Sequence, residues 1–157
     1  MSLDSPTAIA VDGATFKVGI VAARFNQRYV DGLLASVGEV LQAAGVPTAH
    51  IRTIRVPGSG ELPSGAQMLL ERGGFDVCIA LGVIIKGGTL HDQLVAEAAQ
   101  QGLMRISLDR RTPIIAGVVT ANDDVQAEDR CLGEINRGAE FARGALEMAA
   151  LKKQFSS

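Results

Sequence analysis

The feature that most constrains the fold of this chain is an uninterrupted apolar run from Cys78 to Ile85. The run has the length of a strand, contains β-branched residues and shows no alternation with polar residues. A strand of this composition needs apolar neighbours on both faces, which is typical of the interior of a parallel sheet. We therefore predict that residues 76–85 form the central strand of the fold.

Three other segments have strand character, and helix-forming segments separate them. The predicted strands cover residues 16–22, 50–56, 76–85 and 114–120. The second of them alternates with threonine and arginine and is predicted to lie at an edge of the sheet. After the first strand, apolar residues at helical spacing form one stripe that ends before Gly45: Val30, Leu33, Leu34, Val37, Leu41 and Ala44.

Alternating strands and helices favour a parallel sheet with right-handed crossovers. We predict an α/β three-layer sandwich, in which helices cover both faces of a four-stranded, flavodoxin-like parallel sheet. Residues 1–14 are polar and small and are predicted to form a flexible N-terminal arm, in which residues 8–11 are suited to add an edge strand to a neighbouring subunit. Residues 15–157 have the length of a single domain.

Composition argues against several classes of partner. The net charge is −2 and no basic block is present, so neither nucleic acid nor an anionic membrane is expected as a partner. No apolar run approaches the roughly 18 residues of a membrane span, and the N-terminus lacks a signal-peptide pattern. Cys78 and Cys131 belong to no C-x-x-C pair and are expected to be reduced thiols of a cytoplasmic protein. We expect neither a metal site nor a cofactor.

The loops that follow the strands are the expected place for a ligand. In open parallel sheets, ligands bind outside the carboxyl ends of the strands, near a change in strand order. Residues 23–26, 57–61, 86–91 and 120–123 should meet at this edge. Several of the less common residue types of the chain lie in these loops, which favours a functional site there.

The turn after the central strand carries the strongest chemical signal. Gly87 and Gly88 precede Thr89, which is suited to cap a helix predicted to start at Leu90. Free backbone N–H groups at such a helix start favour anion binding, assisted by the helix dipole. His91 lies in the first helical turn, and the imidazole of histidine is a common proton-transfer group. This pattern indicates a phosphate site beside a group able to transfer protons.

Two nucleotide-binding motifs are approached but incomplete. The segment from Gly82 to Thr89 lacks the Walker A lysine, because Gly88 stands in its place, so a nucleoside triphosphatase is disfavoured. The Gly58-Ser59-Gly60 segment lacks the third glycine of a dinucleotide fingerprint, because Pro63 stands there.

Four side chains near the predicted site each allow two interpretations. Phe25 follows an apolar strand and either stacks on a flat heterocycle or folds back onto the core. Glu61 either complements a helix dipole or accepts hydrogen bonds from ring N–H and hydroxyl groups. Arg130 and Arg137 flank the segment 131–136 and are either solvated or able to hold a phosphate with two hydrogen bonds.

Taken in order, these segments resemble the lumazine synthase family of riboflavin biosynthesis. The similarity runs from about residue 17 to residue 155, with gaps only near 131–136. The matching pieces are Arg24-Phe25-Asn26, Val56 to Pro63, Gly82 to His91, Pro113 to Thr120, Arg130, Asn136 to Glu140 and Ala145 to Met148.

The resemblance implies an enzyme that condenses 5-amino-6-ribitylaminouracil with 3,4-dihydroxy-2-butanone 4-phosphate. His91 would transfer protons. Phosphate would bind at Gly88 and Thr89, assisted by Arg130 across a subunit boundary and by Arg137. The implied contacts to the pyrimidine and ribityl groups are Phe25, Asn26, Ser59, Gly60, Glu61, Val83, Ile84, Ile85 and Ala116.

The sequence departs from the family pattern at three positions. Family members usually carry aromatic residues where this chain has Gly60, Asp92 and Ala116. The alternative interpretation is a divergent paralogue with weak or no turnover that binds flavin or lumazine as an oligomeric shell protein. A different reaction on the same scaffold, as in archaeal riboflavin synthase, is disfavoured by the Gly-Gly-Thr-x-His turn. The family implies a pentamer or a multiple of pentamers, and the segment 131–136, which lacks a glycine-rich pattern, favours a pentamer.

Overall fold

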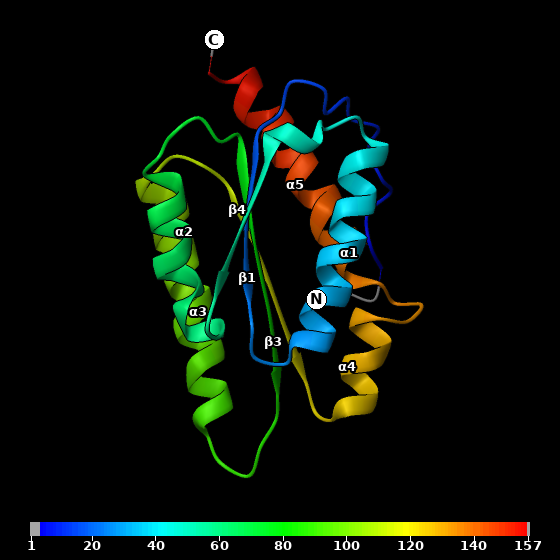
Figure 1. Ribbon diagram of the computed structural model, residues 1–157, viewed down its shortest axis with the longest axis vertical. Helices are drawn as coiled ribbons and strands as arrows, with labels where there is room; N and C mark the ends of the chain where they lie inside the picture. Colours follow the sequence, from blue (N-terminus) through cyan, green and yellow to red (C-terminus); the bar gives the residue numbers. More distant parts are fainter. Residues whose placement is uncertain (1–3, 157) are drawn as a thin grey trace.

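The computed structural model describes residues 4–156, and Figure 1 shows three layers with the sheet between two sets of helices. The four strands are parallel and lie in the order β2-β1-β3-β4: β1 (Val18–Ala23), β2 (Ile51–Val56), β3 (Val77–Ile85) and β4 (Ile114–Ala121). One face is covered by α1 (Gln27–Ala43), α4 (Asp124–Cys131) and α5 (Arg137–Gln154), and the other by α2 (Leu62–Leu70) and α3 (His91–Asp109). Two short 3-10 helices are η1 (Thr48–His50) and η2 (Ser59–Glu61). The predicted three-layer α/β fold is confirmed.

The apolar run identified in the sequence lies inside the sheet. β3 is placed between β1 and β4, and its residues from Val77 to Val83 are buried. β2 lies at an edge, as predicted, and exposes Arg52, Thr53 and Arg55. The polar alternation of β2 and the continuous apolar run of β3 therefore follow from their positions in the sheet.

Each face of the sheet has its own apolar core. On the α1 side, Val30, Leu33, Val37 and Leu41 are fully buried against β1 and β3. Burial of one leucine side chain contributes roughly 1.5–3 kcal/mol, so this stripe is sufficient to hold α1 on the sheet. On the α2 and α3 side, the smaller core includes Leu62, Leu69 and Leu103.

The ends of the elements follow the expected turn chemistry, with one correction. Gly45 closes α1 with φ 89°, and Pro63 lies in the first turn of α2 as predicted. α3 begins at His91, one residue later than predicted, and Leu90 rather than Thr89 occupies the N-cap position. The reason is that the Thr89 hydroxyl accepts only a long hydrogen bond, 3.4 Å from the His91 backbone nitrogen.

Residues 4–14 contain no helix or strand, and residues 1–3 of the predicted arm lie outside the described residues. The arm passes α5, where the Ser5 hydroxyl donates to Glu140 Oε1 at 3.1 Å. Among the helices of residues 4–156, none is long and apolar enough to span a bilayer.

Both cysteines are buried thiols. Cys78 lies in β3 and Cys131 ends α4, and neither forms a disulfide. Burial raises the pKa of the Cys78 thiol to about 12 and that of Cys131 to about 11. Because the thiolate is the nucleophilic form, neither residue has the character of a catalytic cysteine.

Candidate functional site

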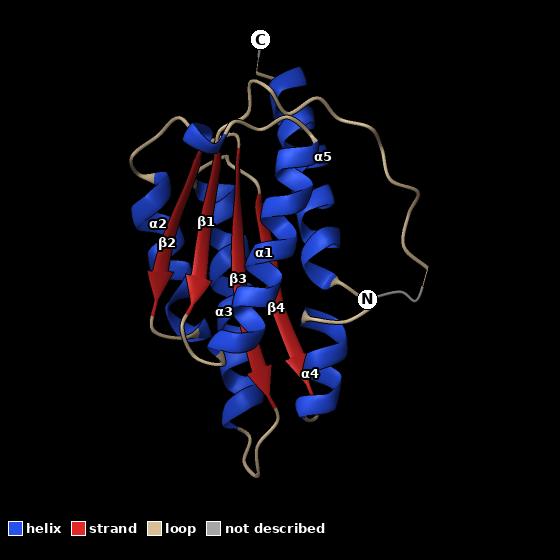
Figure 2. Ribbon diagram, turned by 45° about the vertical axis from the view of Figure 1, so that its right-hand side comes forward, coloured by secondary structure: helices blue, strands red, loops and turns tan. Residues whose placement is uncertain are grey.

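A cavity of about 420 Å³ opens at the carboxyl edge of the sheet. Figure 2 shows that all four strands point toward this edge. The cavity is formed by the loops after β1 and β2, the end of β3 and the first turns of α3. Its lining consists of Phe25, Asn26, Gly58, Ser59, Gly60, Glu61, Val83, Ile84, Ile85, His91, Asp92 and Val95.

The loop after β1 is fastened to both neighbouring elements. The backbone N–H of Phe25 donates to the carbonyl of Pro57 at 3.0 Å. Asn26 has a left-handed backbone, with φ 56°, and its side-chain amide donates to the carbonyl of Val83 at 2.7 Å. Asparagine tolerates this backbone better than most residues. Asn26 therefore turns the chain into α1 and fixes the loop to the end of β3.

Phe25 does not fold back onto the core. Its side chain is 71% exposed at the mouth of the cavity. A methyl group added to Gly58 would lie 2.9 Å from Phe25 Cδ2, so the ring rests against a glycine backbone. An exposed aromatic ring held at a cavity mouth is suited to stack on a flat heterocycle.

The turn after β2 presents a carboxylate. Glu61 Oε2 accepts a hydrogen bond from the Gly58 backbone N–H at 2.9 Å, which fixes the side chain at the cavity wall. Ser59 is buried against Gly82 of β3, where an added methyl group would clash with the Ser59 hydroxyl. Glycine at position 82 therefore lets this turn approach the central strand closely.

The glycine turn lies beside the cavity and remains open to solvent. Gly87, Gly88 and Thr89 are exposed, and a methyl group added to either glycine would meet no atom within 4 Å. His91 lines the cavity from the first turn of α3. The backbone amides predicted to bind an anion are thus outside the packed core, and they shortly precede His91 in the chain.

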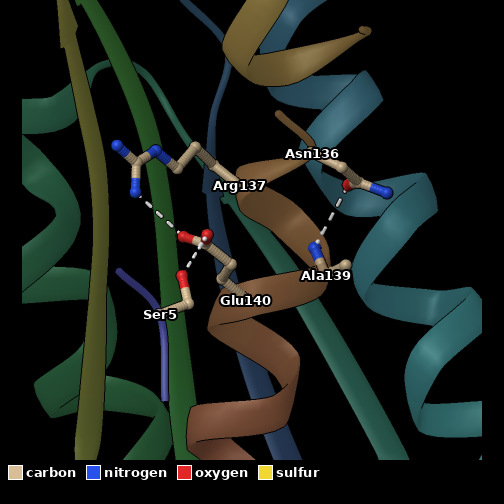
Figure 3. Close-up of polar contacts among 5 residues, drawn as sticks. All are labelled: Ser5, Asn136, Arg137, Ala139 and Glu140. Atoms are coloured by element: carbon tan, nitrogen blue, oxygen red, sulfur yellow. Dashed lines mark hydrogen bonds and ion pairs between the residues drawn. The ribbon is translucent and has the colours of Figure 1, made fainter. Parts of the chain in front are cut away.

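Five predicted site residues do not line this cavity: Gly88 and Thr89, which belong to the adjacent glycine turn, and three residues from other parts of the chain. Ala116 lies on β4, paired in register with Ala80, and packs toward the core under α2 and α3. Arg130 lies in the last turn of α4, where its guanidinium makes a long 3.4 Å contact with the carbonyl of Gln126. Arg137 pairs with Glu140 Oε2 at 2.9 Å, and Figure 3 shows Ser5 bound to the same carboxylate. Ala116 lies on the edge strand β4, and the two arginines lie on α4 and α5, the helices that follow β4 in the chain.

The comparisons with known proteins determine the family. Residues 15–153 match the family model for 6,7-dimethyl-8-ribityllumazine synthase. The chain is 42% identical over 153 residues to the 6,7-dimethyl-8-ribityllumazine synthase of Paracidovorax citrulli, covering 98% of this chain and 97% of the relative. The proteins of the same name from Halorhodospira halophila and Thermococcus kodakarensis are 39% and 38% identical, covering 100% and 90% of each chain. This chain belongs to the lumazine synthase family.

The resemblance predicted from the sequence motifs is therefore confirmed. The part that matches the lumazine synthase model, residues 15–153, includes every residue that lines the cavity. The sequence pattern identifies Asp92 only as a departure from the lumazine synthase family and does not predict Val95 as a site residue. Their spacing from His91, one and four residues, places all three side chains near one side of α3 and would have revealed them. Asp92 also lines a second cavity of about 240 Å³, together with Lys86 and Asn122.

We predict that Asn26→Ala lowers the free energy of unfolding by about 2 kcal/mol, because alanine loses the hydrogen bond to Val83 and is strained at positive φ. Asn26→Gly removes the same hydrogen bond but tolerates the backbone, and should be less destabilised by about 1 kcal/mol. Urea unfolding of the two variants and the wild type measures both effects. Equal stability of the alanine and glycine variants would contradict the role assigned to the backbone of Asn26.

Proposed function

We propose that this chain condenses 5-amino-6-(D-ribitylamino)uracil with 3,4-dihydroxy-2-butanone 4-phosphate to give 6,7-dimethyl-8-ribityllumazine, phosphate and water. This is the penultimate step of riboflavin biosynthesis. One observation supports this proposal most directly. Phe25, Glu61 and His91 line the same cavity, beside an exposed glycine turn, in a chain of this family.

In this proposal the aminouracil occupies the cavity. The exposed ring of Phe25 stacks on the pyrimidine, and the end of β3, from Val83 to Ile85, borders its edge. Glu61 uses one carboxylate oxygen to hold Gly58 and has the other available for the hydroxyl groups of the ribityl chain. Asn26, Ser59 and Gly60 complete this part of the site.

The phosphate of the second substrate binds at the glycine turn. Gly88 and Thr89 contribute exposed backbone N–H groups near the start of α3, where the helix dipole favours an anion. Arg130 and Arg137 of a neighbouring copy supply guanidinium groups. A neighbouring copy is required because neither arginine lines the cavity of its own chain.

The chemistry is redox-neutral and requires no cofactor. The 5-amino group adds to the ketone and one water leaves, and elimination of phosphate then leaves an enol that becomes a second carbonyl. The ribitylamino nitrogen adds to that carbonyl and closes the ring with loss of a second water. His91 transfers protons in these steps. Holding both substrates in register lowers the barrier by roughly 7–11 kcal/mol, whereas a positioned acid or base contributes about 10²–10⁴-fold. Proximity is therefore the larger contribution.

A homo-oligomer completes the site, and a pentamer is the proposed form. Two features support association of copies of this chain. Helix α3 and its N-cap residue Leu90 expose an apolar stripe that also includes Leu94, Met104 and Leu108, and such patches mark association surfaces. Strand β4 is apolar and only half-buried at several positions, and in residues 4–156 no strand pairs with its outer edge. The free, buried thiols are consistent with a cytoplasmic location for the enzyme.

The alternative function is a lumazine- or flavin-binding protein with little turnover. The observation that favours it is the open wall at Gly60, where an added methyl group would meet nothing within 4 Å. Mixing the protein with both substrates and following lumazine absorbance separates the two functions. Product formation above the spontaneous background supports the enzyme, and binding without product supports the alternative. Light scattering on the same sample gives the size of the assembly.

We predict that His91→Ala slows turnover by roughly 10²–10⁴-fold without abolishing it, because proximity remains when the proton-transfer group is removed. In contrast, Arg130→Ala should mainly raise KM for the phosphate substrate. Steady-state rates of lumazine formation measure both effects. If His91→Ala remained folded and formed no product above background, the dominant role of proximity would be wrong.

We predict that Gly60→Phe tightens binding of the aminouracil, because an aromatic side chain would fill the open wall of the cavity and add buried apolar area. KM for the aminouracil should fall several-fold, whereas KM for the phosphate substrate should change little. Gly60→Ala serves as a control for the change in backbone freedom alone. An unchanged KM in Gly60→Phe would show that the substrate does not reach this wall.

A further inference from the structure

The short helix α4, which carries Arg130, is attached to the start of α1 by a row of side-chain contacts. The Tyr29 hydroxyl donates to Asp124 Oδ1 at 2.8 Å, and Arg28 pairs with Glu128 at 3.0 Å. Further along, α4 ends so close to α1 that a methyl group added to Gly32 would lie 2.7 Å from the Cys131 carbonyl oxygen. In Figure 1, α4 lies directly beside the first turns of α1.

Helix α4 also contacts β3, β4 and α5, but the part of it that is buried in the core is small. It is eight residues long, and only Ala127 and Cys131 are buried in the core. Ala127 and Cys131 are small and lie one helical turn apart, so on their own they would leave α4 able to rotate about the line that joins them. The contacts of Asp124 and Glu128 with α1 lie to one side of that line and therefore restrict the roll.

Arg130 leaves the helix on the side opposite to these contacts. It follows Glu128 by two residues, which is a rotation of roughly 200° about the helix axis. A roll of about 20° displaces a group some 6 Å from the axis by roughly 2 Å. Errors of about 1 Å in the placement of binding groups can cost up to 100-fold in rate. The rotation of α4 about its axis therefore determines whether the Arg130 guanidinium lies within hydrogen-bonding distance of a bound phosphate.

Of the two polar contacts, that of Tyr29 is the stronger restraint. Tyr29 is only 7% exposed and belongs to the main core, so packing of its ring fixes the position of its hydroxyl group. The side chains of Arg28 and Glu128 are 63% and 55% exposed, and exposed ion pairs contribute little. The hydrogen bond to Asp124 also raises the pKa of the Tyr29 phenol, as expected for a phenol that donates to a carboxylate.

We propose that Tyr29 is a positioning residue for the phosphorylated substrate, acting through Asp124 to fix the roll of α4 and thereby the direction of Arg130. This inference rests on the proposed function, in which Arg130 binds the phosphate. It assigns to Tyr29 an effect on one substrate only, because the aminouracil site is built from other elements.

The test compares KM for each substrate in the wild type, Tyr29→Phe and Arg28→Gln. Phenylalanine keeps the buried ring, and the exposed Asp124 carboxylate stays hydrated, so folding is retained. Tyr29→Phe should raise KM for the phosphate substrate roughly three- to tenfold, with KM for the aminouracil within about twofold of wild type. Arg28→Gln, the matched control on the same helix pair, should change either KM by less than about twofold. Asp124→Ala should reproduce Tyr29→Phe, whereas Asp124→Asn, which keeps an acceptor oxygen, should restore most of the affinity.

A double variant separates positioning from a general structural effect. In an Arg130→Ala background, Tyr29→Phe should cause no further increase in KM, because the group that it orients is gone. An unchanged KM in Tyr29→Phe, an equal rise for both substrates, or a full additional effect in the Arg130→Ala background would overturn the inference while leaving the proposed function intact. Absence of product with the wild-type protein would overturn the proposed function and this inference together.

Discussion

The burial of β3 on both faces is the constraint on which the rest of the structure depends. It requires helices on each side of the sheet, and the chain supplies them by alternating helices with strands. Because the strands are parallel, the loops that follow β1, β2 and β3 meet at one edge. Gly82 brings the loop after β2 still closer, because it has no side chain and the Ser59 turn can pack directly against the backbone of β3. The cavity with Phe25, Glu61 and His91 is a consequence of this packing.

The proposed chemistry is divided between two parts of the fold. The cavity holds groups suited to a flat heterocycle and a polyol, whereas Arg130 and Arg137 lie on the β4 side and do not line it. In the proposed function, a single chain therefore presents one half of a site at each of two places. This division explains why association of copies and catalysis are linked in the proposed function, and why we expect the attachment of α4 to α1 to affect only one substrate.

Much of the fold and part of the site were predictable from the sequence. The apolar run of β3, the edge character of β2 and the stripe of α1 follow from residue periodicity, and the structure agrees with each. Phe25, Glu61 and His91 were found because they follow strands that share one edge. The predicted start of α3 is wrong by one residue, because capping by Thr89 depends on a local distance that the sequence does not give. The Tyr29–Asp124 hydrogen bond joins residues 95 positions apart and has no sequence pattern to reveal it.

The most direct test of a site shared between copies is the activity of mixed oligomers. Glu61→Lys disables the aminouracil half of the site, and Arg130→Ala disables the phosphate half. In oligomers assembled from equal amounts of the two variants, about a quarter of the interfaces in a closed ring pair an intact cavity with an intact Arg130. We predict that such mixtures recover up to about that fraction of wild-type lumazine formation, well above either variant alone. Activity no greater than the average of the two separate variants, in oligomers shown to contain both, would contradict a site built from two copies.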